Sequence, residues 1–400
     1  MHRLVNVVQG YDWGSRTAIA SLEGRAPSAG PEAELWMGAH PAAPSRLEGL
    51  DTTLLALTQE SPEDVLGARV RGAFGGAFPF LLKVLAAERP LSLQAHPSKA
   101  QAEAGFAEEE ARGVPRNAPH RNYKDANHKP ELLCALTPFD ALCGFREAAE
   151  SARLFSSLDV PRLAPLAGML TGPNGIRSTF EALMRMTGAE KDALLAEVIP
   201  ACARLAAAPG PFADAARWSV TLSAMYPGDV GAVSALLLRH LTLAPGEAIY
   251  LPAGNMHAYL RGTGVEIMAS SDNVLRGGLT PKHVDLTELL RVLDFEARET
   301  RPIVARAVGA HEAVYDTPSP DFRLSRVTLS AGDIFTSTPL GPEILLVTEG
   351  AAHVACGTTR VELASGKSVF VACADGPYEI RAATPRAAVL YRATVGALTS

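Results

Sequence analysis

The sequence Leu91-Ser92-Leu93-Gln94-Ala95-His96-Pro97 sets the expected architecture of this chain. Its apolar residues alternate with Ser92, Gln94 and His96, and a period of two is typical of a half-buried strand. One face therefore packs on a core while the three polar side chains project from the other, and Pro97 ends the strand. A lone strand histidine is more often a packing residue than a metal ligand. The polar face therefore needs partners elsewhere in the chain.

Composition excludes several classes of function. The 400 residues predict two or three domains, and 47% hydrophobic with 20% charged residues predict a folded globular protein. A net charge of −6 without a basic run argues against nucleic acid as a partner. Without a secretory leader or a run of about twenty apolar residues, we expect a cytoplasmic protein and no membrane partner. Five cysteines without a C-x-x-C pair predict free thiols rather than a disulfide framework.

A second polar segment, residues 122–131, precedes the apolar run 132–136. Proline is tolerated at the first residue of a strand, so the strand is expected to start at Pro130 or Glu131. By parity, Lys129 then faces the same way as Glu131, whereas His128 faces away. A carboxylate that enters an apolar strand needs a cation or a metal as its partner, because burying a bare charge is costly.

Helical spacing dominates the middle of the chain, whereas short strands dominate both ends. Helices are expected at 62–71, 101–112, 147–158, 175–187, 189–208 and 212–225. The last four form a helical insertion that ends near Asp229. Residues 305–400 carry short alternating strands separated by glycine and proline turns, which predicts a small sandwich or barrel.

Gly246, Pro252, Gly254 and His257 have the spacing G-x5-P-x-G-x-x-H, which resembles the second motif of the cupin barrel. The glycines permit a tight bend that aims the histidine into the barrel mouth. Imidazole, carboxylate and amide oxygen together suit zinc, with manganese and iron as alternatives. Cupin metal sites pair this motif with an earlier H-x-H and a glutamate, and Gln94 stands where the first of those histidines would be. The resemblance therefore implies Gln94, His96, Glu131 and His257 as the metal ligands.

Residues 365–371 repeat the pattern of residues 245–251, which is a faint internal echo of the same hairpin. Continued in register, Pro377 falls opposite His257. The second barrel is therefore predicted to hold no metal.

Several motifs in one order resemble the type I mannose-6-phosphate isomerase family over nearly the full chain. They are Gly10-Tyr11-Asp12-Trp13-Gly14, Glu34-Leu35-Trp36-Met37-Gly38, Gln94-Ala95-His96-Pro97, Asn122-Tyr123-Lys124-Asp125, His128-Lys129-Pro130-Glu131 and residues 252–259, 271–276 and 278–282. The resemblance implies one zinc ion per chain, on the four ligands named above. It also implies interconversion of D-mannose 6-phosphate and D-fructose 6-phosphate.

The fold implied by the resemblance is mainly β, with two cupin or jelly-roll-like barrels and an inserted α-helical domain. The catalytic barrel is expected from residues 1–146 and 236–304, and the helical domain from residues 147–235. A metal-free barrel follows at 305–400. The expected assembly is a monomer or a weak homo-oligomer.

Aldose–ketose isomerisation moves a proton between C1 and C2 through a cis-enediol, and a metal can stabilise the oxyanion that develops. Three candidates for the base remain open: Lys129 on the metal face, His128 with the better intrinsic pKa, and a zinc-bound hydroxide. Arg276 stays charged at ordinary pH, so its expected role is electrostatic, and the family resemblance marks it as an active-site residue.

The partner implied by the resemblance is a small sugar phosphate. Lysine is a common phosphate-binding point charge, so we expect the phosphate on Ser92, Lys83 and Lys282, with Lys99 as a weaker fourth. Tyr259 and Asp272 are expected to line the cleft. Two other interpretations remain: a cupin enzyme of different reaction, such as an oxygenase or an isomerase of another sugar phosphate, and a non-catalytic sugar-phosphate-binding cupin.

Overall fold

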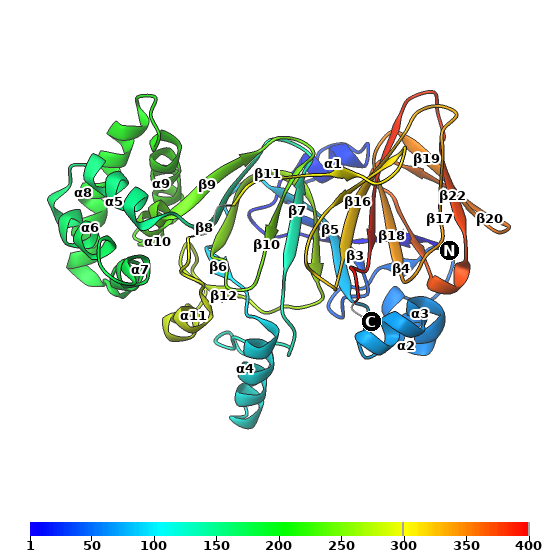
Figure 1. The fold of residues 1–400 in the computed structure, drawn as a ribbon, viewed down its shortest axis with the longest axis horizontal. Helices are drawn as coiled ribbons and strands as arrows, with labels where there is room; N and C mark the ends of the chain where they lie inside the picture. Colours follow the sequence, from blue (N-terminus) through cyan, green and yellow to red (C-terminus); the bar gives the residue numbers. More distant parts are fainter. Residues whose placement is uncertain (298–299, 399–400) are drawn as a thin grey trace.

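The computed structural model describes residues 1–297 and 300–398. Within these residues, helices and strands are about equally abundant, so the fold is mixed rather than mainly β. Figure 1 shows the helices between residues 147 and 235 gathered at one end of an elongated molecule, with the strands in the middle and at the other end. No helix of the described part is both long enough and apolar enough to span a bilayer.

The central sheet has eleven antiparallel strands, and every predicted metal ligand lies on it or beside it. Its main path is β13 (Ile303–Val304), β10 (Glu247–Leu251), β7 (Glu131–Ala135), β11 (His257–Ala269), β5 (Phe80–Ala87), β3 (Glu34–Gly38) and β2 (Val7–Gln9). Off this path lie β6 (Gln94–Ala95), β12 (Leu275–Arg276), β8 (Phe139–Phe145) and β9 (Leu238–Leu243).

Strand β11 joins the two parts of this sheet. Its first residues pair with β6 and β8, and its later residues pair with β5 and β7. The partner changes at Gly262, where φ is +135° and a Cβ atom would lie 2.6 Å from the Phe139 ring. Only glycine fits that close approach. One continuous strand thus carries His257 to one side of the site and Glu266 to the other.

A second sheet has eight strands and takes them from both ends of the chain. Its order is β14 (Arg306–Ala307), β15 (Glu312–Tyr315), β16 (Arg323–Leu329), β23 (Ala388–Thr394), β18 (Glu343–Glu349), β21 (Ser368–Val371), β1 (His2–Val5) and β4 (Arg46–Leu47). The expected division at residue 305 does not anticipate that β1 and β4 pair here. A four-stranded sheet completes this end, in the order β17 (Ile334–Ser337), β22 (Tyr378–Ala382), β19 (Ala351–Cys356) and β20 (Thr359–Ala364).

The helical segment packs its apolar faces together and against the sheet. Its helices are α5 (Ala148–Ser157), α6 (Ala164–Leu170), α7 (Gly175–Arg185), α8 (Gly188–Ala206), α9 (Ala213–Met225) and α10 (Gly231–Ser234). Leu93 and Ala95 are fully buried in the same apolar cluster, so the helical segment covers the apolar face of β6. That packing leaves the opposite face of β6 for the site.

The remaining helices are α1 (Ala18–Leu22), α2 (Leu54–Glu60), α3 (Pro62–Ala73), α4 (Lys99–Ala111) and α11 (Leu286–Val292). Helix α4 begins at Lys99, two residues before the expected range 101–112, and the Ser98 side chain caps it by accepting a hydrogen bond from the Gln101 backbone N–H in a capping box. Helices α1, α2, α6 and α11 were not predicted, since five or seven residues are too short to show a clear helical period.

Candidate metal centre and active site

Three buried side chains converge at the centre of the large sheet: His96, Glu131 and His257. The Nε2 atom of His96 lies 3.3 Å from one Glu131 carboxylate oxygen, and the Nε2 atom of His257 lies 3.5 Å from the other. Sheet register brings them together, because His257 pairs with Gln94 and β11 continues beside β7, which Glu131 begins. The three ligand atoms lie within 4.8 Å of one another.

Backbone carbonyls orient both imidazoles. His96 Nδ1 donates to the carbonyl of Asn273 at 2.7 Å, and His257 Nδ1 donates to the carbonyl of Asn255 at 3.0 Å. Each ring therefore turns Nε2 toward Glu131. Burial lowers the pKa of His96 to about 4, which keeps its imidazole neutral at neutral pH.

The neutral His96 ring presents a lone pair to a carboxylate oxygen, and two acceptors that face each other repel. Among the residues that the structure describes, His96 Nε2 and one Glu131 oxygen are buried without a hydrogen-bond partner. Buried polar atoms are almost always paired, so this arrangement fits a cation between them. Two imidazole nitrogens and a carboxylate are a donor set that zinc accepts.

The Gln94 amide borders the same group. Its Nε2 atom lies 3.3 Å from His257 Nε2, and a half-turn about the last side-chain bond puts the amide oxygen there instead. Gln94 and His96 thus lie on the face opposite Leu93 and Ala95, as the alternation of residues 91–96 predicts.

Lys129 and His128 point in opposite directions from the start of β7. Lys129 Nζ lies 3.2 Å from Glu131, whereas His128 Nε2 lies 2.9 Å from the carboxylate of Asp321, in the C-terminal part of the chain. Burial alone would raise the pKa of Glu131, but the neighbouring Lys129 ammonium counteracts burial, and that pKa lies well below its usual range. Glu131 is therefore ionised at neutral pH.

Lys83 lies inside the sheet among carboxylates. Its Nζ atom is 2.9 Å from Glu266 and 3.6 Å from Glu34, and Trp36 Nε1 donates to Glu34 at 2.7 Å. Burial would lower the pKa of Lys83, but Glu266 and Glu34 raise it, so the ammonium stays charged. Because two carboxylates already pair with it, Lys83 is a poorer phosphate ligand than the sequence suggests.

Sequence reasoning missed Glu34 and Glu266 as members of the site. Both are acids inside apolar strands, in Glu34-Leu35-Trp36 and Val265-Glu266-Ile267. The argument that singled out Glu131, that a buried carboxylate needs a partner, applies to them equally.

A cationic group lies at the other side of the site. Arg276 pairs with Gln94 through the backbones of β12 and β6, and burial lowers the pKa of its guanidinium. Burial, Arg276 and Lys124 together lower the pKa of Lys282, which indicates that the three cations are neighbours. Lys124 was not predicted. Within the part of the chain that the structure describes, no carboxylate contributes to the lowered pKa values of Arg276 and Lys282.

The other predicted residues are more scattered. Tyr259 is buried, with its ring edge-on to Phe139 at 5.4 Å and its hydroxyl without a hydrogen-bond partner. Asp272 lies 3.4 Å from His40. Lys99 donates to the Asn127 side chain at 3.1 Å, outside the metal group. Ser92 is half-buried on the strand segment before Gln94.

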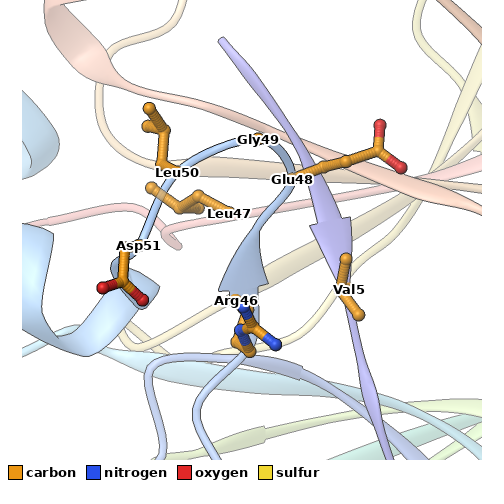
Figure 2. A pocket seen from close by; sticks show the side chains of 7 residues that line it. All are labelled: Val5, Arg46, Leu47, Glu48, Gly49, Leu50 and Asp51. Atoms are coloured by element: carbon orange, nitrogen blue, oxygen red, sulfur yellow. The ribbon is translucent and has the colours of Figure 1, made fainter.

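The cavity drawn in Figure 2 is a different place. It has a volume of about 350 Å³ and is lined by Val5 and the turn from Arg46 to Asp51, at the edge of the eight-stranded sheet. None of the predicted site residues lines it. Its mixed lining and open shape give no reason to assign it chemistry.

Comparisons with known proteins agree with the motifs. Residues 1–148 match the family described as phosphomannose isomerase type I, catalytic domain. The mannose-6-phosphate isomerase of Escherichia coli is 41% identical over 391 residues, covering 95% of this chain and 97% of that protein. The human enzyme of the same name is 32% identical, with 96% of each chain covered.

Solved structures extend this likeness to the fold. The mannose 6-phosphate isomerase of Salmonella typhimurium bound to fructose 6-phosphate and zinc has a TM-score of 0.89 to this chain, at 36% identity, with 99% and 100% of the two chains covered. A zinc-bound mannose 6-phosphate isomerase has the same TM-score, at 37% identity and with 99% of each chain covered. Identity of this level over almost the whole length leaves one conclusion: the chain belongs to the mannose-6-phosphate isomerase family.

Proposed function

We propose that this chain is a zinc-dependent isomerase that interconverts D-mannose 6-phosphate and D-fructose 6-phosphate through a cis-enediol. The observation that carries the proposal is the buried group of His96, Glu131 and His257, in which both rings direct Nε2 toward a carboxylate. Without a cation that arrangement sets lone pairs against each other. Family membership supports the same reaction and the same metal.

Gln94, His96, Glu131 and His257 would hold the zinc ion. When bound, it supplies Lewis-acid stabilisation for the oxygen that becomes an oxyanion as the proton leaves carbon. The chain has to supply the rest: a group that moves the proton, cations that hold the phosphate, and a dry, charged environment. The buried Lys83 with Glu34 and Glu266 provides that environment behind the metal group.

For the phosphate we propose Lys282 and Arg276 together with Lys124. A phosphate dianion complements these cations, because burial and the charges of Arg276 and Lys124 lower the pKa of Lys282 and a bound dianion relieves that repulsion. Ser92 precedes Gln94 by two residues on the same face, and its hydroxyl can donate a hydrogen bond to the phosphate. Lys83 is better described as a buried charge that neutralises Glu266 than as a phosphate ligand.

Lys129 is our first choice for the proton-transferring group. Its Nζ atom lies 3.2 Å from Glu131, so it borders the metal group directly. His128 turns away from that group and pairs with Asp321 at 2.9 Å. Proton transfer requires the base within hydrogen-bond reach of the substrate, which favours the side chain on the metal face.

We also propose the domain arrangement that the family resemblance implies. The catalytic and C-terminal units would each be a cupin-like barrel, and the helices between residues 147 and 235 would be an insertion in the first. Antiparallel sheets before and after the helices support this arrangement. The cytoplasm is the proposed location, because all five cysteines are free, as a reducing compartment would keep them.

The test is a coupled assay with mannose 6-phosphate on the purified protein, after chelation, and after zinc is returned. Activity that disappears on chelation and returns with zinc supports both the reaction and the metal. Full turnover by metal-free protein would contradict the metal assignment. A zinc-loaded protein that binds mannose 6-phosphate without converting it would favour the sugar-phosphate-binding interpretation.

A further inference from the structure

We propose that Asn273 and Asp125 form a clamp that positions His96 for metal binding. The proposal rests on the zinc site proposed above, and it concerns residues that do not touch the metal. His96 donates its Nδ1 proton to the backbone carbonyl of Asn273 at 2.7 Å. The position of that carbonyl therefore sets the direction in which His96 aims Nε2.

The Asn273 side chain is fully buried and uses all of its hydrogen-bonding capacity. Its amide oxygen accepts from the backbone N–H of Lys124 at 2.7 Å and of Asp125 at 3.3 Å. Its amide nitrogen donates to the backbone carbonyls of Asp125 at 2.7 Å and of Asn127 at 2.9 Å. An amide has two donors and two acceptor sites, and only asparagine at this length meets all four backbone groups.

The Asp125 carboxylate completes the clamp from the other segment. One oxygen accepts from the Ser271 hydroxyl at 2.8 Å and from the backbone N–H of Asn127 at 2.9 Å. The other accepts from the backbone N–H of Asp272 at 2.7 Å. Hydrogen bonds to an ionised carboxylate are stronger than those between neutral groups. Segments 124–127 and 271–273 are thus fastened to each other on both sides.

The clamp explains why two distant segments approach the metal group together. Segment 124–127 leads into Lys129 and Glu131, and segment 271–273 leads into Arg276. Asn273 therefore connects one predicted metal ligand, Glu131, to another, His96, through backbone hydrogen bonds rather than through the metal. The support of His257 is more local, because its Nδ1 atom bonds the carbonyl of Asn255, only two residues away.

The experiment compares zinc affinity in the full-length wild type, Asn273→Ala and Asn273→Asp, measured by competition with a chromophoric chelator. We expect zinc to bind each variant about 10- to 100-fold more weakly, as loss of support for metal-bound histidines does elsewhere. Asn273→Asp replaces a donor with a charged acceptor that faces two carbonyls, so it should weaken zinc binding at least as much as alanine.

Asn6→Ala is the matched control. The Asn6 amide bonds two side chains, Ser368 and Ser45, rather than backbone groups, and it lies near the eight-stranded sheet and away from the metal group. We expect wild-type zinc affinity for Asn6→Ala even if its zinc-free melting temperature falls as far as that of the Asn273 variants. A structural defect alone would lower the melting temperature without this selective loss of zinc affinity.

Asp125→Asn replaces the Asn273 variants in this experiment if neither of them folds, because it keeps the size of the side chain and weakens only the carboxylate contacts. Zinc affinity within twofold of the wild type in the folded variants would overturn the clamp. If the wild type binds zinc but does not isomerise the sugar, and the variants bind zinc more weakly than the wild type, the proposed function is overturned and the clamp is upheld. A wild type that does not bind zinc would overturn both.

Discussion

Replacing Lys83 with methionine tests whether the buried charges behind the metal group act as one unit. The substitution keeps most of the side-chain volume but removes the ammonium that lies 2.9 Å from Glu266 and 3.6 Å from Glu34. Both carboxylates are almost fully buried and cannot replace that partner with water. We expect a large loss of stability at neutral pH.

The magnitude follows from these distances. With an effective dielectric constant of about 20, Coulomb's law gives roughly 6 kcal/mol of attraction at 2.9 Å and roughly 5 kcal/mol at 3.6 Å. Several kcal/mol are recovered because the ammonium no longer has to be desolvated. The net cost of removing one partner of a buried pair is typically about 3 to 5 kcal/mol, and we expect a value in that range.

The cost should depend on pH. Burial raises the pKa of Glu266 even with Lys83 present, and loss of the ammonium raises it further. A carboxyl whose pKa is higher in the folded than in the unfolded state destabilises the fold most when it is ionised. The loss of unfolding free energy in Lys83→Met should therefore be largest at pH 8. It should become smaller as the pH falls toward 5 and Glu266 takes up a proton.

Urea unfolding monitored by tryptophan fluorescence measures this loss of unfolding free energy at pH 8 and pH 5. Trp36 is a local reporter because Lys83 Nζ lies 5.5 Å from the centre of its ring. The double variant Lys83→Met/Glu266→Gln should lose less stability than the sum of the two single variants. A loss below 1 kcal/mol at pH 8, or strict additivity in the double variant, would refute the argument.

Three further predictions concern the metal, the phosphate and the packing. The melting temperature should rise with the logarithm of zinc concentration, by mass action on the folded state, and a flat response would contradict the metal site. Because burial and Arg276 lower the pKa of Lys282, the KM for mannose 6-phosphate should rise at alkaline pH in the wild type but stay level in Lys282→Arg. Parallel KM profiles of the two proteins would exclude Lys282 as a phosphate ligand. Gly105→Ala should lower the free energy of unfolding by about 1 to 3 kcal/mol, because its Cβ would lie 2.2 Å from the buried Tyr123 ring. Gly168→Ala is the control, because the space around Gly168 in helix α6 is open, and it should be neutral or stabilising. Equal effects of the two substitutions in thermal denaturation would show that the Tyr123 ring moves aside.

Local alternation predicted much of the site geometry. Residues 91–96 placed Gln94 and His96 on one face, and the start of β7 placed Lys129 beside Glu131 and His128 away from it. A period of two is a short-range property, so it can be seen in the sequence. The longer helices α3, α4, α5, α7, α8 and α9 were predicted to within a few residues for the same reason.

Contacts that depend on register between distant strands were not predictable. Lys83 faces Trp36 on β3 and Glu266 on β11 only because three strands pair in one particular register. Nothing within segments 34–38, 80–87 or 257–269 specifies that register. The clamp around Asn273 was hidden in the same way, because five of its hydrogen bonds go to backbone groups, which every residue carries.

The pairing of β1 with β21 has a consequence for synthesis. Arg3 pairs with Val369, so the partner of the first strand leaves the ribosome 366 residues after it. At a translation rate of about 5 to 20 residues per second, the edge of β1 that pairs with β21 stays unpaired for on the order of 20 to 70 s. During that time β1 presents an unpaired strand edge of the kind that invites association between nascent chains. Slow translation should therefore favour aggregation of this chain more than that of a protein whose first strand pairs locally.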